Sequence, residues 1–168
     1  MFIKFAAAAA LVIASSSAFA AQPGTFYAGA DVGKTKIEDI SGRATSAGAF
    51  IGYNVLPNVA IEAGYRRLGD YRFSAFGVSG DVDLDQAALS VVGTLPLSNG
   101  FSLLGRLGYN RIEAKADVAG FSDKESDSSA LVGVGVGYAF TPAVSARLEL
   151  QKPGSDATNV SVGVAFQF

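Results

Sequence analysis

The chain has no cysteine and no histidine among its 168 residues, and only 17% of them are charged. Without cysteine no disulfide can cross-link the fold, and without either residue neither a Ser-His-Asp nor a Cys-His catalytic arrangement can form. We therefore expect a protein that is not an enzyme, has no catalytic residues and needs no cofactor. A hydrophobic content of 49% also argues against a disordered chain.

A metal site is not expected either, although aspartates alternate at Asp81, Asp83 and Asp85. An EF-hand calcium loop would need glycine in place of Gln86 and glutamate in place of Val92. We interpret this segment as the solvated acidic end of a strand, with weak divalent-ion binding as the alternative.

Long hydrophobic runs are missing beyond the N-terminus. After residue 20 no apolar run approaches the roughly 18 residues that a membrane-spanning helix needs. The N-terminus itself has Lys4, then an apolar run at 5–13, then Ala18-Phe19-Ala20 as a small-x-small cleavage motif. This order predicts a cleaved secretory signal peptide over 1–20 and a single mature domain over 21–168.

The mature sequence does have apolar residues at every second position, in eight segments. Their expected ranges are 25–37, 44–55, 59–68, 81–95, 101–115, 129–140, 144–152 and 159–168. Short uncharged turns are expected at 56–58, 96–100 and 141–143, and mostly longer polar loops at 38–43, 69–80, 116–127 and 153–158. Period two is the side-chain period of a β-strand. We predict an all-β fold, an eight-stranded antiparallel up-and-down transmembrane β-barrel with short periplasmic turns and longer extracellular loops.

One face of each predicted strand is apolar along its length. The last strand shows this well, with small or polar residues between Val160, Val162, Val164, Phe166 and Phe168. Aromatic residues gather at the strand ends, where membrane barrels have interfacial girdles. We expect this face to contact lipid.

The opposite face has charged residues at mid-strand positions, among many Gly, Ser, Asn and Gln residues. They are Asp31, Glu62, Arg66, Arg106, Arg147 and Glu149. The acids and the arginines balance, and enclosed charges are costly unless they are paired. We predict an internal ion-pair network that fills the lumen, since an eight-stranded barrel is just wide enough for side chains. The alternative is the wet face of a soluble sheet, which would leave the apolar face without a cover.

Basic residues continue the lipid-facing register past the apolar band, at the strand ends that face the long loops. They are Lys34, Lys36, Arg43, Arg67, Arg111 and Lys152. Lys and Arg form charge-assisted hydrogen bonds with phosphate, so these residues are candidates for contacts with lipopolysaccharide. A solvated rim without a ligand is an equally good interpretation.

Gly-Tyr pairs occur at 52–53, 64–65, 108–109 and 137–138, and the chain ends on Phe166-Gln167-Phe168. With the signal peptide and the eight strands, these features resemble the OmpA/OmpX-type small outer-membrane β-barrels, often described as porin family. The resemblance implies Sec-dependent export to the outer membrane of a Gram-negative bacterium. It also implies that the alternating residues of the last strand, Val160 to Phe168, form the signal that the β-barrel assembly machinery reads, after escort by periplasmic chaperones.

The resemblance has two further implications. Glu62, Arg106, Arg147 and Glu149 occupy places like those of the internal ion pairs of the OmpA barrel, for which a gating role has been proposed. Full-length OmpA also has a periplasmic peptidoglycan-binding domain, whereas this sequence ends at the last strand. We therefore expect no such domain and no tethering of the cell wall.

In functional terms we expect a monomeric structural barrel that contributes to outer-membrane integrity. Its partners would be outer-membrane lipid and lipopolysaccharide, with no nucleic acid. The loops at 69–80 and 116–127, with Phe73, Phe76 and Phe121, are available for surface interaction or adhesion. The alternatives are a narrow ion-conducting channel and a periplasmic lipocalin-like carrier, whose barrel has its apolar face inside.

Overall fold

The structure is a computed structural model that describes the backbone of residues 22–37, 44–75, 78–118, 121–154 and 157–168. It describes their side chains except at 37, 69–84 and 114–125. The predicted signal peptide, Arg43 and Phe76 therefore lie outside the described residues, and Phe73 and Phe121 lie outside the described side chains.

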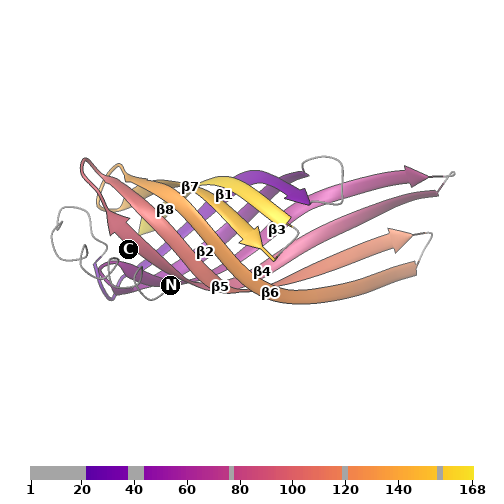
Figure 1. Cartoon of the computed structure of the whole chain (residues 1–168), viewed down its shortest axis with the longest axis horizontal. Coiled ribbons are helices and arrows are strands. Elements are labelled where there is room, and N and C mark those ends of the chain that lie inside the picture. The colour runs from indigo at the N-terminus through magenta and orange to yellow at the C-terminus, as the bar shows by residue number, and fades with distance from the viewer. Residues whose placement is uncertain (1–21, 38–43, 76–77, 119–120, 155–156) are drawn as a thin grey trace, which may run out of the picture.

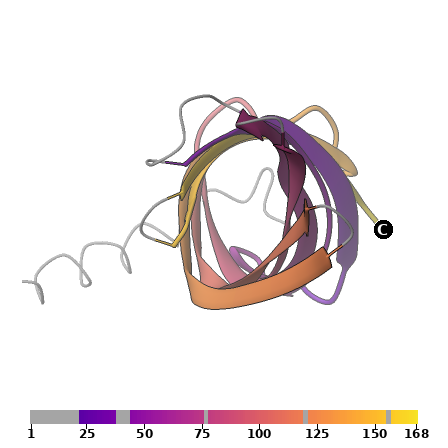
Figure 2. The same cartoon turned by 90° about the vertical axis from the view of Figure 1, so that its right-hand side faces the viewer.

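Strands follow one another along the chain and pair in the same order. They are β1 (Phe26–Ile37), β2 (Ala44–Leu56), β3 (Val59–Ala75), β4 (Val78–Pro96), β5 (Phe101–Val118), β6 (Phe121–Ala139), β7 (Val144–Pro153) and β8 (Ala157–Gln167). Each strand pairs antiparallel with its sequence neighbours, and β8 pairs with β1 to close the sheet. Seen from its end, the sheet is a ring (Figure 2). The predicted up-and-down barrel is confirmed. None of the described ranges contains a helix long and apolar enough to cross a membrane.

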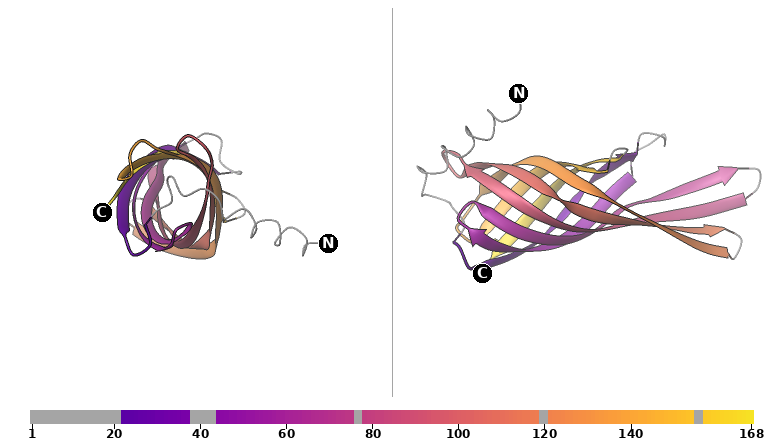
Figure 3. Two further views of the ribbon diagram at one scale, coloured as in Figure 1. Left: turned by 90° about the vertical axis from the view of Figure 1, so that its left-hand side faces the viewer. Right: turned by 60° about the horizontal axis from the view of Figure 1, so that its bottom comes forward.

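The pair β1 and β8 closes the barrel wall. Its register runs from Tyr27 opposite Gln167 to Ile37 opposite Ala157. Beyond it, Phe26 N donates to Phe168 O at 3.1 Å and Phe168 N donates to Phe26 O at 2.8 Å. The C-terminus thus lies at the end of the barrel with the short turns, called here the turn end, opposite the loop end (Figures 1 and 3). Closure matters in lipid, where an open edge would leave backbone N–H and C=O groups without partners.

The outer wall is apolar at mid-height. Leu107, Val134 and Leu89 are 67%, 62% and 60% exposed, because alternate residues of each strand point outward. Exposed apolar side chains on this scale match a hydrocarbon solvent and not water. This register excludes the lipocalin-like carrier, which needs its apolar face inside.

Aromatic rings lie side by side on the outer wall at the turn end. The ring centroids of Phe26 and Tyr53 are 4.9 Å apart, those of Phe101 and Tyr138 are 4.8 Å apart, and those of Tyr138 and Phe140 are 5.0 Å apart. This is the position of the predicted interfacial girdle on that side.

Four strands are longer than the sequence predicts. β3 and β4 continue as a hairpin to Ala75 opposite Val78, and β5 and β6 continue to Val118 opposite Phe121. The expectation of loops at 69–80 and 116–127 was therefore wrong for most of these residues, which are strand. Both hairpins extend past the other four strands at the loop end (Figures 1 and 3). The prediction missed them because a hairpin outside the membrane meets water on both faces, so no apolar alternation marks it.

Candidate functional site

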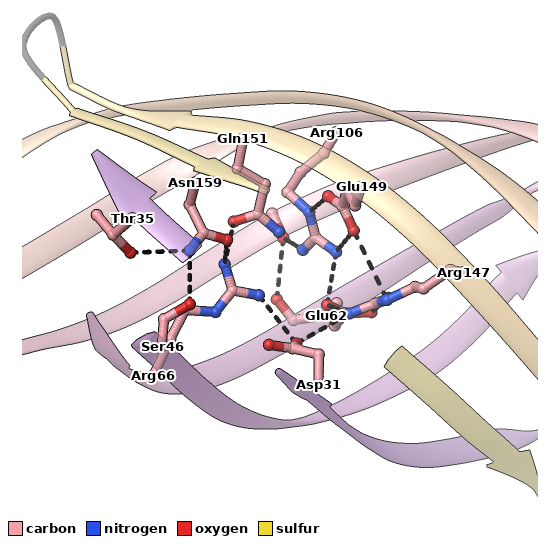
Figure 4. A network of polar contacts seen from close by, with 11 residues as sticks. Asp31, Thr35, Ser46, Glu62, Arg66, Arg106, Arg147, Glu149, Gln151 and Asn159 are labelled. Atoms are coloured by element: carbon pink, nitrogen blue, oxygen red, sulfur yellow. Dashed lines mark hydrogen bonds and ion pairs between the residues drawn. The ribbon is translucent and has the colours of Figure 1, made fainter. Parts of the chain in front are cut away.

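The charged residues predicted to face inward are all in the lumen, and the structure brings them together (Figure 4). Asp31 is on β1, Glu62 and Arg66 are on β3, Arg106 is on β5, and Arg147 and Glu149 are on β7. All of them therefore come from odd-numbered strands.

The even-numbered strands provide small residues beside these charges. Asp31 lies opposite Gly48 on β2 and Gly163 on β8. Arg147 likewise lies opposite Gly137 on β6 and Gly163 on β8. A Cβ added at Gly163 would stand 2.9 Å from the Asp31 Cβ. The narrow lumen accommodates these long charged side chains because the neighbouring residues in the wall are glycines, which have no side chain.

Arg106 is at the centre of the half of the network nearer the turn end. Its Nη2 donates to Glu62 Oε1 at 2.7 Å, its Nε to Glu149 Oε1 at 2.5 Å and its Nη1 to Ser90 Oγ at 2.6 Å. The side chain is 5% exposed. One guanidinium on β5 thus connects β3, β4 and β7, and its buried charge is compensated by two carboxylates.

Arg147 closes this half toward the turn end. Its Nη1 and Nη2 donate to the two oxygens of Glu62 at 2.7 and 3.1 Å, a bidentate pair. Its guanidinium carbon lies 3.6 Å from the ring centroid of Phe50, a cation–π arrangement. The Tyr27 hydroxyl donates to Glu62 Oε2 at 2.9 Å. Glu62 therefore accepts hydrogen bonds from three strands, and both arginines depend on it.

Arg66 holds the half of the network nearer the loop end. Its Nη2 donates to Asp31 Oδ2 at 2.9 Å. Its Nη1 donates to Asn159 Oδ1 at 2.7 Å and to Gln151 Oε1 at 3.0 Å. Arg147 Nη2 lies 4.0 Å from Asp31 Oδ2 and joins the two halves. The network therefore connects β1, β3, β5 and β7 across the lumen and also includes Asn159 of β8.

The sequence prediction missed the neutral members of this network. Asn159 Nδ2 donates to Thr35 Oγ1 at 2.9 Å and to Ser46 Oγ at 2.7 Å. These residues, Gln151 and Tyr27 all stand at the alternate strand positions whose side chains point into the lumen. The odd or even position of a residue along its strand was the available signal. It shows that a side chain points inward, but it does not separate a side chain that forms hydrogen bonds from one that only fills space.

Toward the turn end the lumen is open below Arg147. A cavity of about 390 Å³ is lined there by residues that include Tyr27, Asn54, Thr94, Ser102 and Arg147. A solute that enters from the turn end meets the pair of Arg147 and Glu62. Within the described lumen this ion pair and those above it lie between the cavity and the loop end.

Of the six basic residues expected at the rim, the five that the structure describes lie on the outer face at the loop end. Arg67 Nε is 3.6 Å from Asp85 Oδ1. Arg111 Nε is 3.8 Å from Glu113 Oε1. The lysines of the set, Lys34, Lys36 and Lys152, are exposed on β1 and β7. The structure therefore divides this set and does not place it in one cluster.

The chain matches the model of the outer membrane protein beta-barrel domain over residues 6–168. It belongs to this family. Among curated proteins of related sequence, outer membrane protein A of Shigella flexneri is 30% identical in an alignment 169 residues long, gaps included, that covers 86% of this chain and 49% of that protein. The chain spans about half the length of the curated relatives it matches.

Solved structures share the architecture. Neisserial surface protein A has a TM-score of 0.68 at 20% identity, covering 85% of this chain and 97% of that one. Ail, the attachment invasion locus protein of Yersinia pestis, has a TM-score of 0.60 at 15% identity, covering 88% of this chain and all of that one. These likenesses show the fold. Together with the family they make the protein an integral β-barrel of the Gram-negative outer membrane, with its apolar wall in lipid.

Proposed function

We propose that the protein is a structural component of the outer membrane and contributes to the integrity of that membrane. The observation that carries this proposal is the lumen that arginines and carboxylates occupy, paired with one another across the barrel. Outside, the wall presents apolar side chains at lipid level. A barrel of this kind occupies the membrane without an open path for solutes.

Removing the gene from its Gram-negative host tests the proposal. Uptake of a large hydrophobic dye and sensitivity to detergent with EDTA should both rise. A plasmid copy of the gene should return both to the level of the parent strain. A variant in which both hairpins are replaced by short turns should also return dye uptake and detergent sensitivity to the level of the parent strain, because the proposal assigns membrane integrity to the barrel and not to the hairpins. Unchanged dye uptake in the deletion strain would contradict it.

Surface interaction is a second candidate, favoured by the two hairpins that extend past the rim. Ail, which shares the fold, has been solved in complex with the heparin analogue sucrose octasulfate. If this chain has such a role, the hairpin-shortened variant will lose attachment to host-cell or polysaccharide surfaces while it still restores the dye barrier. That result would separate the two roles.

Assembly is expected to depend on the last strand. We propose that the β-barrel assembly machinery reads Val160, Val162, Val164, Phe166 and Phe168, which are all exposed on the outer wall, and that periplasmic chaperones deliver the chain. Phe168→Ala should slow the appearance of folded protein in cells, measured by gel mobility after a pulse of expression. Refolding of the purified variant in detergent, where no machinery is present, should change less.

A further inference from the structure

The rim lysines lie on one side of the barrel, over β7, β8 and β1. Lys36 is opposite Thr158 on β8. The β7–β8 register has Gln151 opposite Asn159, so the next position places Lys152 beside the same Thr158. Neighbouring strands are about 4.8 Å apart, so the Cα atoms of Lys36 and Lys152 are roughly 10 Å apart. Two long, flexible side chains at this spacing can reach one headgroup.

Lys34 belongs to the same group. It lies two residues below Lys36 on β1, opposite Val160 on β8, and all three lysines have the outward parity of their strands. We call Lys34, Lys36 and Lys152 the lysine seam. They bring three positive charges to the outer surface of three adjacent strands.

The outer face of these strands has no described negative charge. Within the described ranges, the acidic residues of β1, β7 and β8 are Asp31 and Glu149, and both are buried in the lumen. Elsewhere on the rim Arg67 and Arg111 lie beside Asp85 and Glu113. Among the described side chains of the outer rim, the three lysines of the seam therefore have no acidic neighbour, whereas both arginines do.

The lysine seam lies where the apolar wall ends. Val32 and Leu150 lie directly below it and Val160 lies opposite Lys34, and all three are exposed to the outside, so acyl chains contact the wall at that level. Lys34 and Lys152 stand two residues higher than Val32 and Leu150 along the same strands, and Lys36 stands four residues higher than Val32, at the level of lipid headgroups on the loop side. A ligand here meets apolar surface and positive charge together.

We propose that the lysine seam binds the phosphate groups of an outer-leaflet glycolipid, whose acyl chains lie against Val32, Leu150 and Val160. The ammonium groups donate charge-assisted hydrogen bonds to the phosphate oxygens. This inference rests on the membrane function proposed above, and it narrows the lipopolysaccharide contact expected from the sequence to one side of the barrel.

The test compares two matched variants of the mature chain, refolded in detergent. The triple variant Lys34→Gln, Lys36→Gln, Lys152→Gln removes the lysine seam, and the control Arg67→Gln, Arg111→Gln removes two rim cations outside it. The probe is bisphosphorylated lipid A in mixed micelles, titrated at fixed ionic strength. Each lysine near an anionic surface contributes roughly fivefold in binding, so the triple variant should bind about a hundredfold more weakly. The control should stay within about threefold of the unchanged protein.

Two further probes identify what is bound. Lipid A from which both phosphates have been removed should bind the unchanged protein as weakly as bisphosphorylated lipid A binds the triple variant. Inorganic pyrophosphate should bind far more weakly than the lipid, because it lacks the acyl chains. The assignment to a phosphorylated lipid would be overturned if the unchanged protein bound dephosphorylated lipid A, or pyrophosphate, as tightly as it binds bisphosphorylated lipid A.

Folding is checked in every variant by gel mobility with and without boiling. If the glutamine variant does not fold, the variant with arginine at the same three positions takes its place and should bind lipid A like the unchanged protein. Loss of binding in the arginine variant, or equal loss in the Arg67 and Arg111 control, would overturn the proposal. Folding into phosphatidylcholine bilayers without lipid A tests the structural role separately, because it involves no phosphorylated glycolipid.

Discussion

Glu62 shows how much of the molecule depends on one side chain. It accepts hydrogen bonds from Arg106, Arg147 and Tyr27, which come from three different strands. A carboxylate buried to this extent is stable only because two guanidinium groups compensate its charge, and each guanidinium needs the carboxylate in return. The same interactions place Arg147 above the cavity at the turn end.

Replacing Arg106 by leucine is expected to lower the free energy of unfolding by about 3–5 kcal/mol, because the change leaves buried carboxylates short of a positive partner. Urea unfolding in lipid vesicles, followed by tyrosine fluorescence, measures the effect. Arg111→Leu is the matched control at an exposed site and should cost less than about 1 kcal/mol. Equal stability of the two variants would mean that the ion pairs do not hold the barrel together.

Glu62→Gln tests the ion-conducting alternative. Glutamine has no charge to hold Arg147 in place above the cavity, so the barrier across the lumen should weaken. We expect more frequent openings in planar bilayers than for the unchanged protein. Glu113→Gln, on the outer face, should behave like the unchanged protein. If Glu62→Gln and the unchanged protein conduct alike, these pairs do not set the barrier.

At the scale of the strand, large charged side chains in the lumen lie opposite small residues of the adjacent strands. Asp31, Arg147 and Glu149 on odd-numbered strands each lie between glycine or serine residues of the two neighbouring even-numbered strands. The register between strands is therefore also a steric match, since a shift by one residue would turn each glycine outward and a lipid-facing side chain inward.

Gly163→Ala is expected to lower the free energy of unfolding by about 1–3 kcal/mol through overpacking. Its Cβ would stand 2.9 Å from both the Asp31 Cβ and the Ala30 carbonyl oxygen. The same substitution at Gly105, where no atom lies within 4 Å of the added Cβ, should change stability by less than about 0.5 kcal/mol. Unfolding of both variants in the same vesicles compares them, and a neutral Gly163→Ala would contradict the steric match.

The strands in the membrane were predictable, and their extensions were not. Apolar residues at every second position, as in β8, indicated the number of strands and the face of each because lipid selects one face of every strand. Beyond the rim that selection ends, so the hairpins of β3–β4 and β5–β6 carried no periodic signal. Likewise, parity placed Arg106 and Glu149 in the lumen. Which acid meets which arginine depends on the stagger of strands around the barrel, and the sequence does not display it.

At the scale of the whole molecule, a closed hydrogen-bonded sheet resists detergent. Unboiled protein is expected to migrate differently from boiled protein on a denaturing gel, because the sheet unfolds only on heating. Protease added to intact cells should cut only at the loop end, within or between the exposed hairpins. A single band under both conditions, or release of the protein with the periplasm, would contradict the membrane barrel.

The placement of the lumen charges also constrains the order of events during folding. Arg66 pairs with Asp31 from β3 to β1, Arg106 from β5 to both β3 and β7, and Arg147 from β7 to β3. Each of these pairs skips the adjacent strand. A lone β1–β2 or β5–β6 hairpin in the bilayer would thus hold Asp31 or Arg106 without its partner in the lumen, which is unfavourable in hydrocarbon. The barrel is therefore expected to insert as one cooperative unit, in which neutralisation of its interior coincides with joining β8 to β1.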